Sequence, residues 1–297
     1  MPAPLVHLID SHIYIFRSYF SMPEMTAPDG MPTQAAYGFT NTLLRFLSEE
    51  RPTHLACCFD FAMTSFRNDL FPDYKVSRGE EAPEDLEPQF DLCKRAAQAL
   101  GLPVFEAVDY EADDVIATLV DSLLGSGCRM QVLTTDKDLA QLVTEDGRVV
   151  LYDLAKETRL DAEGVREKFG VSPVQIPDYL ALLGDKVDDL PGVPGYGKKS
   201  AAIALSAFDR LEAVPGEAEG WEGVEVRGAA RLAREMAAHR EQALRIRELA
   251  TVVREVPGIR SDLADLRWEG APAGAFDALC AELGWGRIAE RVPRPAS

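Results

Sequence analysis

Three aspartates each follow a short apolar run that has the length of a β-strand. Asp10 follows LVHLI, Asp60 follows HLACCF, and Asp136 follows QVLTT. Further acids gather in three short segments, YEADD, TDKD and GDKVDD. Taken singly, such clusters are more often solvated turns or helix caps, because acids complement the positive end of a helix dipole. The carboxylates in these places are Asp10, Asp60, Glu111, Asp113, Asp114, Asp136, Asp138, Asp185 and Asp188.

Nine carboxylates brought together would repel one another, and some would be protonated unless cations lay between them. Ligands that offer only oxygen suit hard ions such as Mg²⁺ or Mn²⁺. Two such ions ~3.5–4 Å apart can hold a phosphate, one activating the attacking water and the other stabilising the leaving oxygen. A zinc site is not indicated, because the four histidines do not have the spacing of zinc ligands; they are His7, His12, His54 and His239. If the fold brings the acids together, they predict phosphate chemistry that depends on divalent ions.

The elements that must position these acids alternate between strand and helix patterns. Such alternation is typical of βαβ units and a mainly parallel sheet. In such a sheet the ligand site lies beyond the carboxyl ends of the strands, where the three strand-ending aspartates would meet. The helical patterns span residues 35–47 and 90–100, and further strand-like runs span residues 103–105 and 148–152.

The character of the sequence changes near residues 170–173. Strand-like runs become rare after this point, and helical segments are joined by turns rich in glycine and proline. We predict an α/β domain over residues 1–171 and a helical region over residues 172–297. Within the second region we expect a surface loop over residues 211–226, a helix over residues 228–253 and a frayed end over residues 291–297.

Bases and aromatics follow the second strand in the segment SFRNDLFPDYKVSR. By itself this segment is better explained as an amphipathic surface helix with its bases in solvent. Beside a metal site, however, Lys75 and Arg78 could hold the scissile phosphate while Tyr74 stacks on a base. Arg67 belongs to the same group of candidate DNA contacts.

A glycine-rich turn, GVPGYGKKS, precedes a predicted helix over residues 201–208. It is not a P-loop, which needs GxxxxGK[ST] directly after a strand. A helix N-terminus that offers free N–H groups, with bases beside it, can grip a DNA phosphate without reading sequence. The candidate contacts here are Gly192, Gly195, Gly197, Lys198 and Lys199.

The formal charge of −18 over 297 residues at first argues against a nucleic-acid partner, since such binders are usually basic. A metal-dependent phosphodiesterase nevertheless concentrates acids at its metal site, so the position of charge matters more than its sum. No run approaches the ~20 apolar residues of a membrane span, and no signal peptide is visible. The five cysteines show no CxxC spacing, which favours reduced thiols. We expect a cytoplasmic protein without membrane contact.

The motifs together resemble a known family, the 5′ nucleases found as the N-terminal domain of bacterial DNA polymerase I and as free-standing flap endonucleases. The similarity spans about residues 5–257 and follows the order IDS, YGF, FD…SFR…YK..R, YEADD, TDKDL, GD..D.LPGVPGYG.K.A and HREQAL..RELAT. It implies a PIN-like (resolvase-like) α/β domain with a helical arch over about residues 63–95. It also implies a helix-three-turn-helix domain, a kind of helix-hairpin-helix unit, that grips duplex DNA.

The resemblance also implies roles for individual residues. Lys75 and Arg78 would contact the scissile phosphate at the base of the arch, and carbonyls of the turn over residues 192–197 would hold K⁺. Two positions depart from the family pattern, since Asp189 stands where Asn is usual and Lys198 where Glu is common. The arch segment GEEAPEDLEP is also acidic. By the same likeness the catalytic-metal cluster is Asp10, Asp60, Glu111, Asp113 and Asp114, and the neighbouring cluster is Asp136, Asp138, Asp185 and Asp188.

The predicted function is therefore a structure-dependent 5′ nuclease, a 5′ to 3′ exonuclease and flap endonuclease that hydrolyses DNA with two Mg²⁺ ions, or Mn²⁺ in their place. Its expected partner is DNA with 5′ ends, flaps or nicks. We expect it to act in DNA replication and repair as a free-standing monomer. A PIN-type ribonuclease shares the carboxylate core and stays open as an alternative, as does a non-catalytic DNA-junction binder. A haloacid-dehalogenase-type phosphatase is disfavoured, because His12 stands where that class needs an aspartate.

Overall fold

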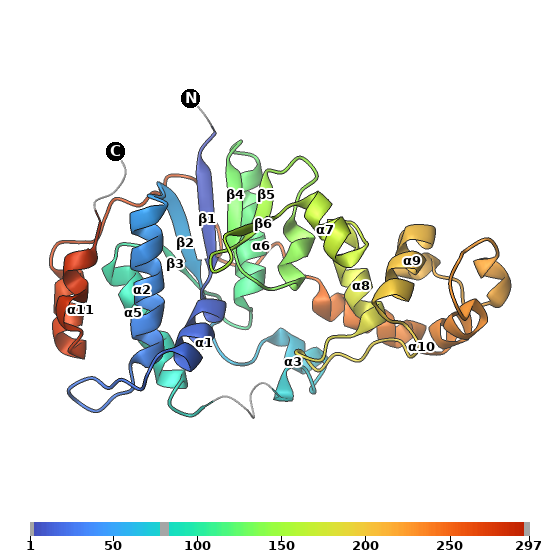
Figure 1. Ribbon diagram of the computed structural model, residues 1–297, viewed down its shortest axis with the longest axis horizontal. Coiled ribbons are helices and arrows are strands. Elements are labelled where there is room, and N and C mark those ends of the chain that lie inside the picture. The colour runs from blue at the N-terminus through green and yellow to red at the C-terminus, as the bar shows by residue number, and fades with distance from the viewer. Residues whose placement is uncertain (1–2, 78–82, 294–297) are drawn as a thin grey trace.

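A six-stranded sheet forms the centre of the computed structural model, which describes residues 3–77 and 83–293 (Figure 1). The strand order is β3-β2-β1-β4-β5-β6. The first five strands in this order run parallel and β6 is antiparallel to β5, so the prediction of a mainly parallel sheet is confirmed. The strands are β1 (Leu5–Asp10), β2 (His54–Cys58), β3 (Val104–Phe105), β4 (Arg129–Leu133), β5 (Val149–Asp153) and β6 (Thr158–Leu160).

The alternation of side chains along β1 explains why both faces of the sheet are covered. Val6 and Leu8 point to one face and pack in a cluster with α6, whereas Ile9 points to the other and packs with α1 and α2. Successive side chains of a strand point to opposite faces, so a parallel sheet that is apolar on both needs two layers of helices. The helices beside the sheet are α1 (Ser11–Ser21), α2 (Gln34–Glu49), α5 (Glu87–Ala99) and α6 (Ala112–Leu124), whereas α3 (Phe66–Leu70) lies away from the sheet, toward the helical part (Figure 1).

The helical part of the chain extends from the sheet at the end opposite to α11 (Figure 1). Its helices are α7 (Ala162–Phe169), α8 (Ile176–Leu183), α9 (Lys198–Phe208) and α10 (Ala229–Ala250), with short 3-10 turns η1 (Asp138–Leu142), η2 (Pro173–Gln175), η3 (Leu211–Ala213) and η4 (Ala218–Trp221). Helix α9 begins three residues before the predicted start at residue 201. The predicted surface loop over residues 211–226 instead carries η3 and η4, because Leu211, Val214 and Trp221 are buried and anchor it.

Residues 266–293 return to the sheet, although the sequence places them with the helical region. The Leu266 carbonyl accepts a 2.9 Å hydrogen bond from Leu55 N, and Trp268 Nε1 donates one of 2.9 Å to the Leu100 carbonyl. Helix α11 (Ala275–Leu283) and η5 (Gly286–Arg291) share a buried cluster with α2 and α5. The last part of the described chain thus packs on α2 and α5 at one side of the α/β domain. The end of the segment predicted to fray, residues 294–297, lies outside the described residues.

Candidate active site

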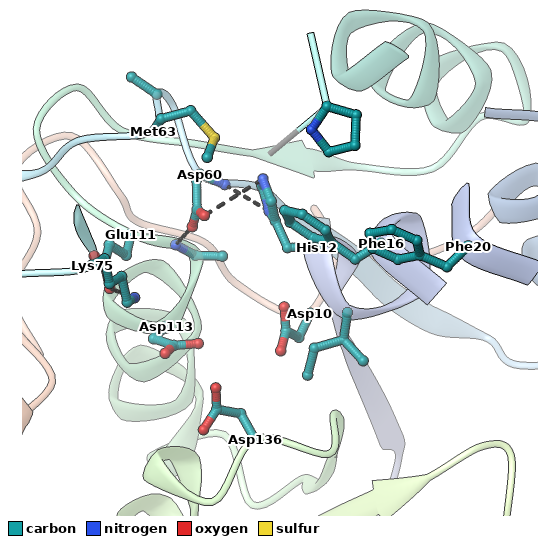
Figure 2. A pocket seen from close by; sticks show the side chains of 14 residues that line it. Asp10, His12, Phe16, Phe20, Asp60, Met63, Lys75, Glu111, Asp113 and Asp136 are labelled. Atoms are coloured by element: carbon teal, nitrogen blue, oxygen red, sulfur yellow. Dashed lines mark hydrogen bonds and ion pairs between the residues drawn. The ribbon is translucent and has the colours of Figure 1, made fainter. Parts of the chain in front are cut away.

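A pocket of about 370 Å³ opens at the carboxyl ends of β1, β2 and β4, beside the N-terminus of α6 (Figure 2). The pocket is lined by charged and by apolar side chains, and Phe16 and Phe20 form an apolar side opposite to Lys75 and Glu111 (Figure 2). The charged residues are Asp10, Asp60, Lys75, Glu111, Asp113 and Asp136, and the apolar ones are Ile13, Phe16, Phe20, Ala62, Met63 and Pro83. The expected meeting of the three strand-ending aspartates is therefore found.

Asp10 is the last residue of β1 and is only 4% exposed. Thr134, at the end of β4, donates a 2.7 Å hydrogen bond from Oγ1 to Oδ2 of Asp10, and accepts one of 2.9 Å from the amide of Asp136. The ends of the two neighbouring strands are thereby tied together. Burial, and then the charges of Asp136 and Asp60, raise the pKa of Asp10 to about 7 although the Thr134 bond opposes the shift. The group is therefore poised to lose a proton when a cation approaches.

Asp60 is oriented by His12, a residue that the sequence interpretation did not include in the site. His12 Nδ1 accepts a 3.3 Å hydrogen bond from the amide of Asp60, and its Nε2 lies 3.5 Å from Oδ2 of the same residue. The amide of Ala112 donates a 2.6 Å bond to Oδ1. His12 also stacks on Phe90, and burial lowers its pKa, so the ring is neutral and Nε2 carries the proton. His12 stands two residues after the aspartate that ends a strand, and this position could have indicated that it belongs to the site.

Lys75 and Glu111 form a partly buried ion pair at the rim of the pocket. Lys75 Nζ lies 2.8 Å from Glu111 Oε2, and the Tyr74 hydroxyl donates a 3.2 Å hydrogen bond to the same oxygen. Burial opposes ionisation of Glu111, but the charges of Lys75 and Arg67 lower its pKa. Lys75 is held in the left-handed region, at φ 55, and its amide donates to the Asp188 carbonyl. The ammonium is therefore fixed beside the carboxylates.

Asp113 and Asp114 stand side by side in the first turn of α6 but point to different places. Asp113 lines the pocket, and burial together with the charges of Asp136 and Asp10 raises its pKa well above the usual value. Asp114 is fully buried and accepts two 2.7 Å hydrogen bonds from Arg67. Arg67 also donates to the Leu249 carbonyl, at the end of α10. The structure thus corrects two predictions: Asp114 does not line the pocket, and Arg67 is a buried partner of Asp114 with no surface for DNA.

The structure also differs from the sequence interpretation at Tyr74, which is 4% exposed and packs in the core around α6. It offers no free ring face on which a base could stack. The amphipathic helix considered for this segment is short, because α3 ends before Pro72, whose ring cannot continue a helix. Arg78 and residues 79–82 of the acidic arch segment lie outside the described residues.

A second carboxylate cluster lies next to the pocket. Asp138, Asp185 and Asp188 each offer an oxygen within 4.8 Å of the others. The loop that carries the last two is pinned at Gly184, where a Cβ would lie 2.4 Å from the amide of Gly192. Burial and the charge of Asp136 raise the pKa of Asp138 well above the usual value. Asp136, which points into the first pocket, joins the two clusters along the chain (Figure 2).

The second cluster has the geometry to hold a hard divalent ion, and the acids of the pocket offer donors of the same kind. All of their side-chain donors are carboxylate oxygens, which such ions prefer, and Oδ1 of buried Asp138 has no hydrogen-bond partner. Burial of an oxygen that accepts no hydrogen bond costs free energy that a closely bound cation would recover. We assign Asp10, Asp60, Asp113 and Asp136 as the acids available to an ion in the pocket, and the second cluster as available to another.

The glycine-rich turn forms an exposed corner on the helical part of the chain. Gly195 has φ 89, and Gly192 lies so close to α8 that a Cβ would be 2.3 Å from the Leu183 carbonyl. Gly197 is the N-cap of α9, and its amide donates a 2.8 Å hydrogen bond to the Ser200 hydroxyl. Lys198 and Lys199 are exposed in the first turn of α9. Two lysines therefore stand in the exposed first turn of a helix, and anion binding at this turn stays a prediction.

Known proteins match the chain in both halves. Residues 5–170 match the family model for the N-terminal resolvase-like domain of 5′-3′ exonucleases, and residues 171–273 match that for their C-terminal SAM fold. The chain is 38% identical over 207 residues to the 5′-3′ exonuclease of Aquifex aeolicus, covering 70% of this chain and 71% of that protein.

The DNA polymerase I of Bacillus caldotenax is 36% identical over 295 residues, covering 98% of this chain and 32% of that protein. The chain therefore spans about a third of the length of such relatives. Among solved structures, T5 5′-exonuclease with bound divalent zinc has a TM-score of 0.68 at 18% identity, covering 96% of this chain and 99% of that one. The catalytic core of Rad2 in complex with DNA substrate has a TM-score of 0.61 at 15% identity, covering 97% and 90%. At identities this low, the similarity shows that this chain has the same fold as the two structures and nothing further.

Proposed function

The chain belongs to the 5′-3′ exonuclease family, and on that premise we propose that it is a structure-dependent 5′ nuclease that hydrolyses phosphodiesters of DNA with 5′ ends, flaps or nicks. The single observation that carries the proposal is the meeting of Asp10, Asp60, Asp113 and Asp136 with Lys75 in one pocket at the sheet edge. Acids alone would support any divalent-ion chemistry. A fixed ammonium among them supports chemistry on a phosphate.

We propose Mg²⁺ as the ion, with Mn²⁺ as a substitute, because both are hard cations that accept carboxylate ligands. When two ions are bound, they would supply an activated water and stabilise the leaving oxygen. Asp10, Asp113 and Asp136 would hold the ion in the pocket. Asp60 would be a further ligand of this ion. Its orientation is set by the hydrogen bonds that it makes with His12 and with the start of α6. The second cluster would hold the other ion.

Lys75 would bind a non-bridging oxygen of the scissile phosphate and stabilise its charge as the bond breaks. Glu111 positions the ammonium through the 2.8 Å contact, and the Tyr74 hydroxyl supports Glu111. Tyr74 thus acts through other side chains, in place of the base stacking expected from the sequence. We keep Arg78 as a proposed second phosphate contact on the strength of the family resemblance.

The apolar side of the pocket would receive the nucleotide beside the scissile bond. Phe16 and Phe20 reach this side from α1, and Phe20 is 71% exposed. Ring faces at such a place accept any base, since every base has a π-face. This suits an enzyme that recognises DNA structure and ignores sequence.

The start of α9 would grip the backbone of the duplex part of the substrate. The exposed position of this helix start and the charges of Lys198 and Lys199 support this role, as does the similarity to a C-terminal domain of 5′-3′ exonucleases. We propose K⁺ as a ligand of the carbonyls of residues 192–197. A monomer, a cytoplasmic location and a part in DNA replication and repair also remain proposals. Among the described helices, none has the length and apolar character that crossing a membrane requires.

Product mapping on end-labelled flap, nicked and single-stranded DNA tests the proposal, with single-stranded RNA as a parallel substrate. We expect cleavage near the 5′ end or flap junction with Mg²⁺ or Mn²⁺, and no product in EDTA. Asp113→Asn should abolish cleavage. Asp121→Asn, on the same helix, is the matched control, because Asp121 makes an exposed ion pair with Arg254, and such pairs contribute ~0–1 kcal/mol. Equal or better cleavage of the RNA would support the PIN-type ribonuclease, and binding of junctions without cleavage would support a non-catalytic binder.

A further inference from the structure

Lys137 lies in the chain between the acids of the pocket and those of the second carboxylate cluster. Its side chain points into the second cluster. Its ammonium contacts Oδ2 of Asp185, and Nζ lies 3.6 Å from Oδ1 of Asp138. The flanking residue Asp136 lines the first pocket. A basic side chain is therefore placed among the oxygens that fit a divalent ion.

The environment of Lys137 keeps its amine protonated. Burial opposes the charge, but Asp138 and Asp185 raise the pKa of Lys137 above its usual value. The two acids are buried, whereas the lysine side chain is 34% exposed. Its four-carbon stem is flexible and one end of it reaches solvent, so the ammonium has a route out of the cluster.

We propose that Lys137 is a tethered counter-cation of the second carboxylate cluster, neutralising it while no divalent ion is bound and leaving when one binds. The inference rests on the metal dependence of the proposed function. A divalent ion that takes Oδ2 of Asp185 as a ligand meets the ammonium at the same oxygen, and like charges this close repel. An ion that binds through this oxygen must therefore displace the lysine contact.

This competition orders the filling of the two sites. In the pocket, Lys75 is paired with Glu111 through the 2.8 Å contact, so an ion at Asp10 and Asp113 does not have to displace it. In the second cluster, the affinity for a divalent ion is reduced by the free energy needed to break the contact between Lys137 and Asp185. One hydrogen bond to a charged group corresponds to roughly 10- to 100-fold in affinity. The second cluster should fill at higher concentrations of divalent ion than the pocket.

Calorimetric titration of the metal-free protein with Mn²⁺ tests the proposal, using Lys137→Gln and, as matched control, Lys186→Gln. Lys186 is exposed and adjacent to Asp185, so both variants remove one positive charge near the cluster. We expect the weaker of two wild-type affinities to tighten by roughly 10- to 100-fold in Lys137→Gln and to change little in Lys186→Gln. In EDTA, Lys137→Gln should melt at a lower temperature than Lys186→Gln. An unchanged or weakened second affinity in Lys137→Gln would overturn the proposal.

A second measurement needs no variant of Lys137. Acylation of lysines by a water-soluble ester, read by mass spectrometry, should modify Lys137 several-fold faster in saturating Ca²⁺ than in EDTA, because a displaced amine is free in solvent. Lys186 serves as the internal control and should react equally under both conditions. Protection of Lys137 that does not change with the ion would contradict displacement. If the wild-type protein binds no divalent ion at all, the proposed function fails together with this inference, whereas two ions with an indifferent Lys137 overturn the inference alone.

Discussion

The two aspartates at the start of α6 should respond oppositely to the same substitution in metal-free buffer. Asp114→Asn leaves the guanidinium of Arg67, which is 2% exposed, without its counter-charge. Removing one partner of a buried ion pair typically costs ~3–5 kcal/mol. At about 2 °C per kcal/mol for a chain of this size, that is a fall of roughly 6–10 °C in Tm. Asp113→Asn should instead raise Tm in EDTA.

The expected rise in Tm for Asp113→Asn follows from the linkage between proton binding and folding. Its folded pKa is raised well above the ordinary value of 3.8, so the folded state holds the proton more tightly than the unfolded state. Stability is then lost as pH rises above the unfolded pKa. Asparagine cannot ionise and removes this loss, so the gain should be larger at pH 8 than at pH 5. Saturating Mg²⁺ should reverse the order, because the wild-type protein gains an ion that Asp113→Asn holds poorly.

Thermal unfolding followed by circular dichroism, at pH 5 and pH 8 with EDTA or Mg²⁺, measures these effects. Arg67→Met combined with Asp114→Leu provides a further check, since removing both charges of a buried pair usually costs much less than the two single changes together. Equal destabilisation by Asp113→Asn and Asp114→Asn in EDTA would refute the assignment of Asp113 to a crowded acidic pocket. A change below ~1 kcal/mol for Asp114→Asn would refute the desolvated pair, because that is the range of surface pairs.

Four other outcomes are expected. Lys75→Ala should slow single-turnover cleavage by ~100-fold or more with an unchanged circular dichroism spectrum, and a small effect would remove Lys75 from the phosphate. Lys198→Ala should weaken DNA binding in a filter assay and reduce the salt slope by about one, while a normal slope would place the duplex elsewhere. Saturation with Mg²⁺ at a hundred times its Kd should stabilise the wild-type protein by ~2.7 kcal/mol in urea unfolding. Finally, burial lowers the pKa of His7 to about 4, so the unfolded state binds the proton first as pH falls from about 6.5 to 4, and stability should drop by about 3 kcal/mol over that window. His7→Leu should flatten this part of the profile.

The sequence was sufficient to predict the parallel sheet and the meeting of Asp10, Asp60 and Asp136. Both depend on regularities of short range: apolar runs of strand length, helices between them, and strand ends that share one edge of a sheet. The second cluster was also visible as acids, although its geometry depends on the close approach of Gly184 and Gly192.

The side-chain partners were not predictable in the same way. Arg67 and Asp114 are 47 residues apart, and nothing in a basic, aromatic segment distinguishes an arginine that turns inward from one that faces DNA. Asp113 and Asp114 differ only by one step of about 100° around a helix, so the choice of which acid enters the pocket depends on the orientation of α6. The return of Trp268 to the sheet is likewise a long-range contact without a local pattern.

That return has a consequence for the synthesis of the protein. Residues 266–293, which share a buried cluster with α2 and α5, leave the ribosome roughly a hundred residues after β6. At ~5–20 residues per second this takes roughly 5–20 s. During that interval all six strands have been made, while the apolar side chains of α2 and α5 that pack against this segment are uncovered. This side of the α/β domain is therefore completed after the helical part has been made, and apolar surface exposed until then favours aggregation.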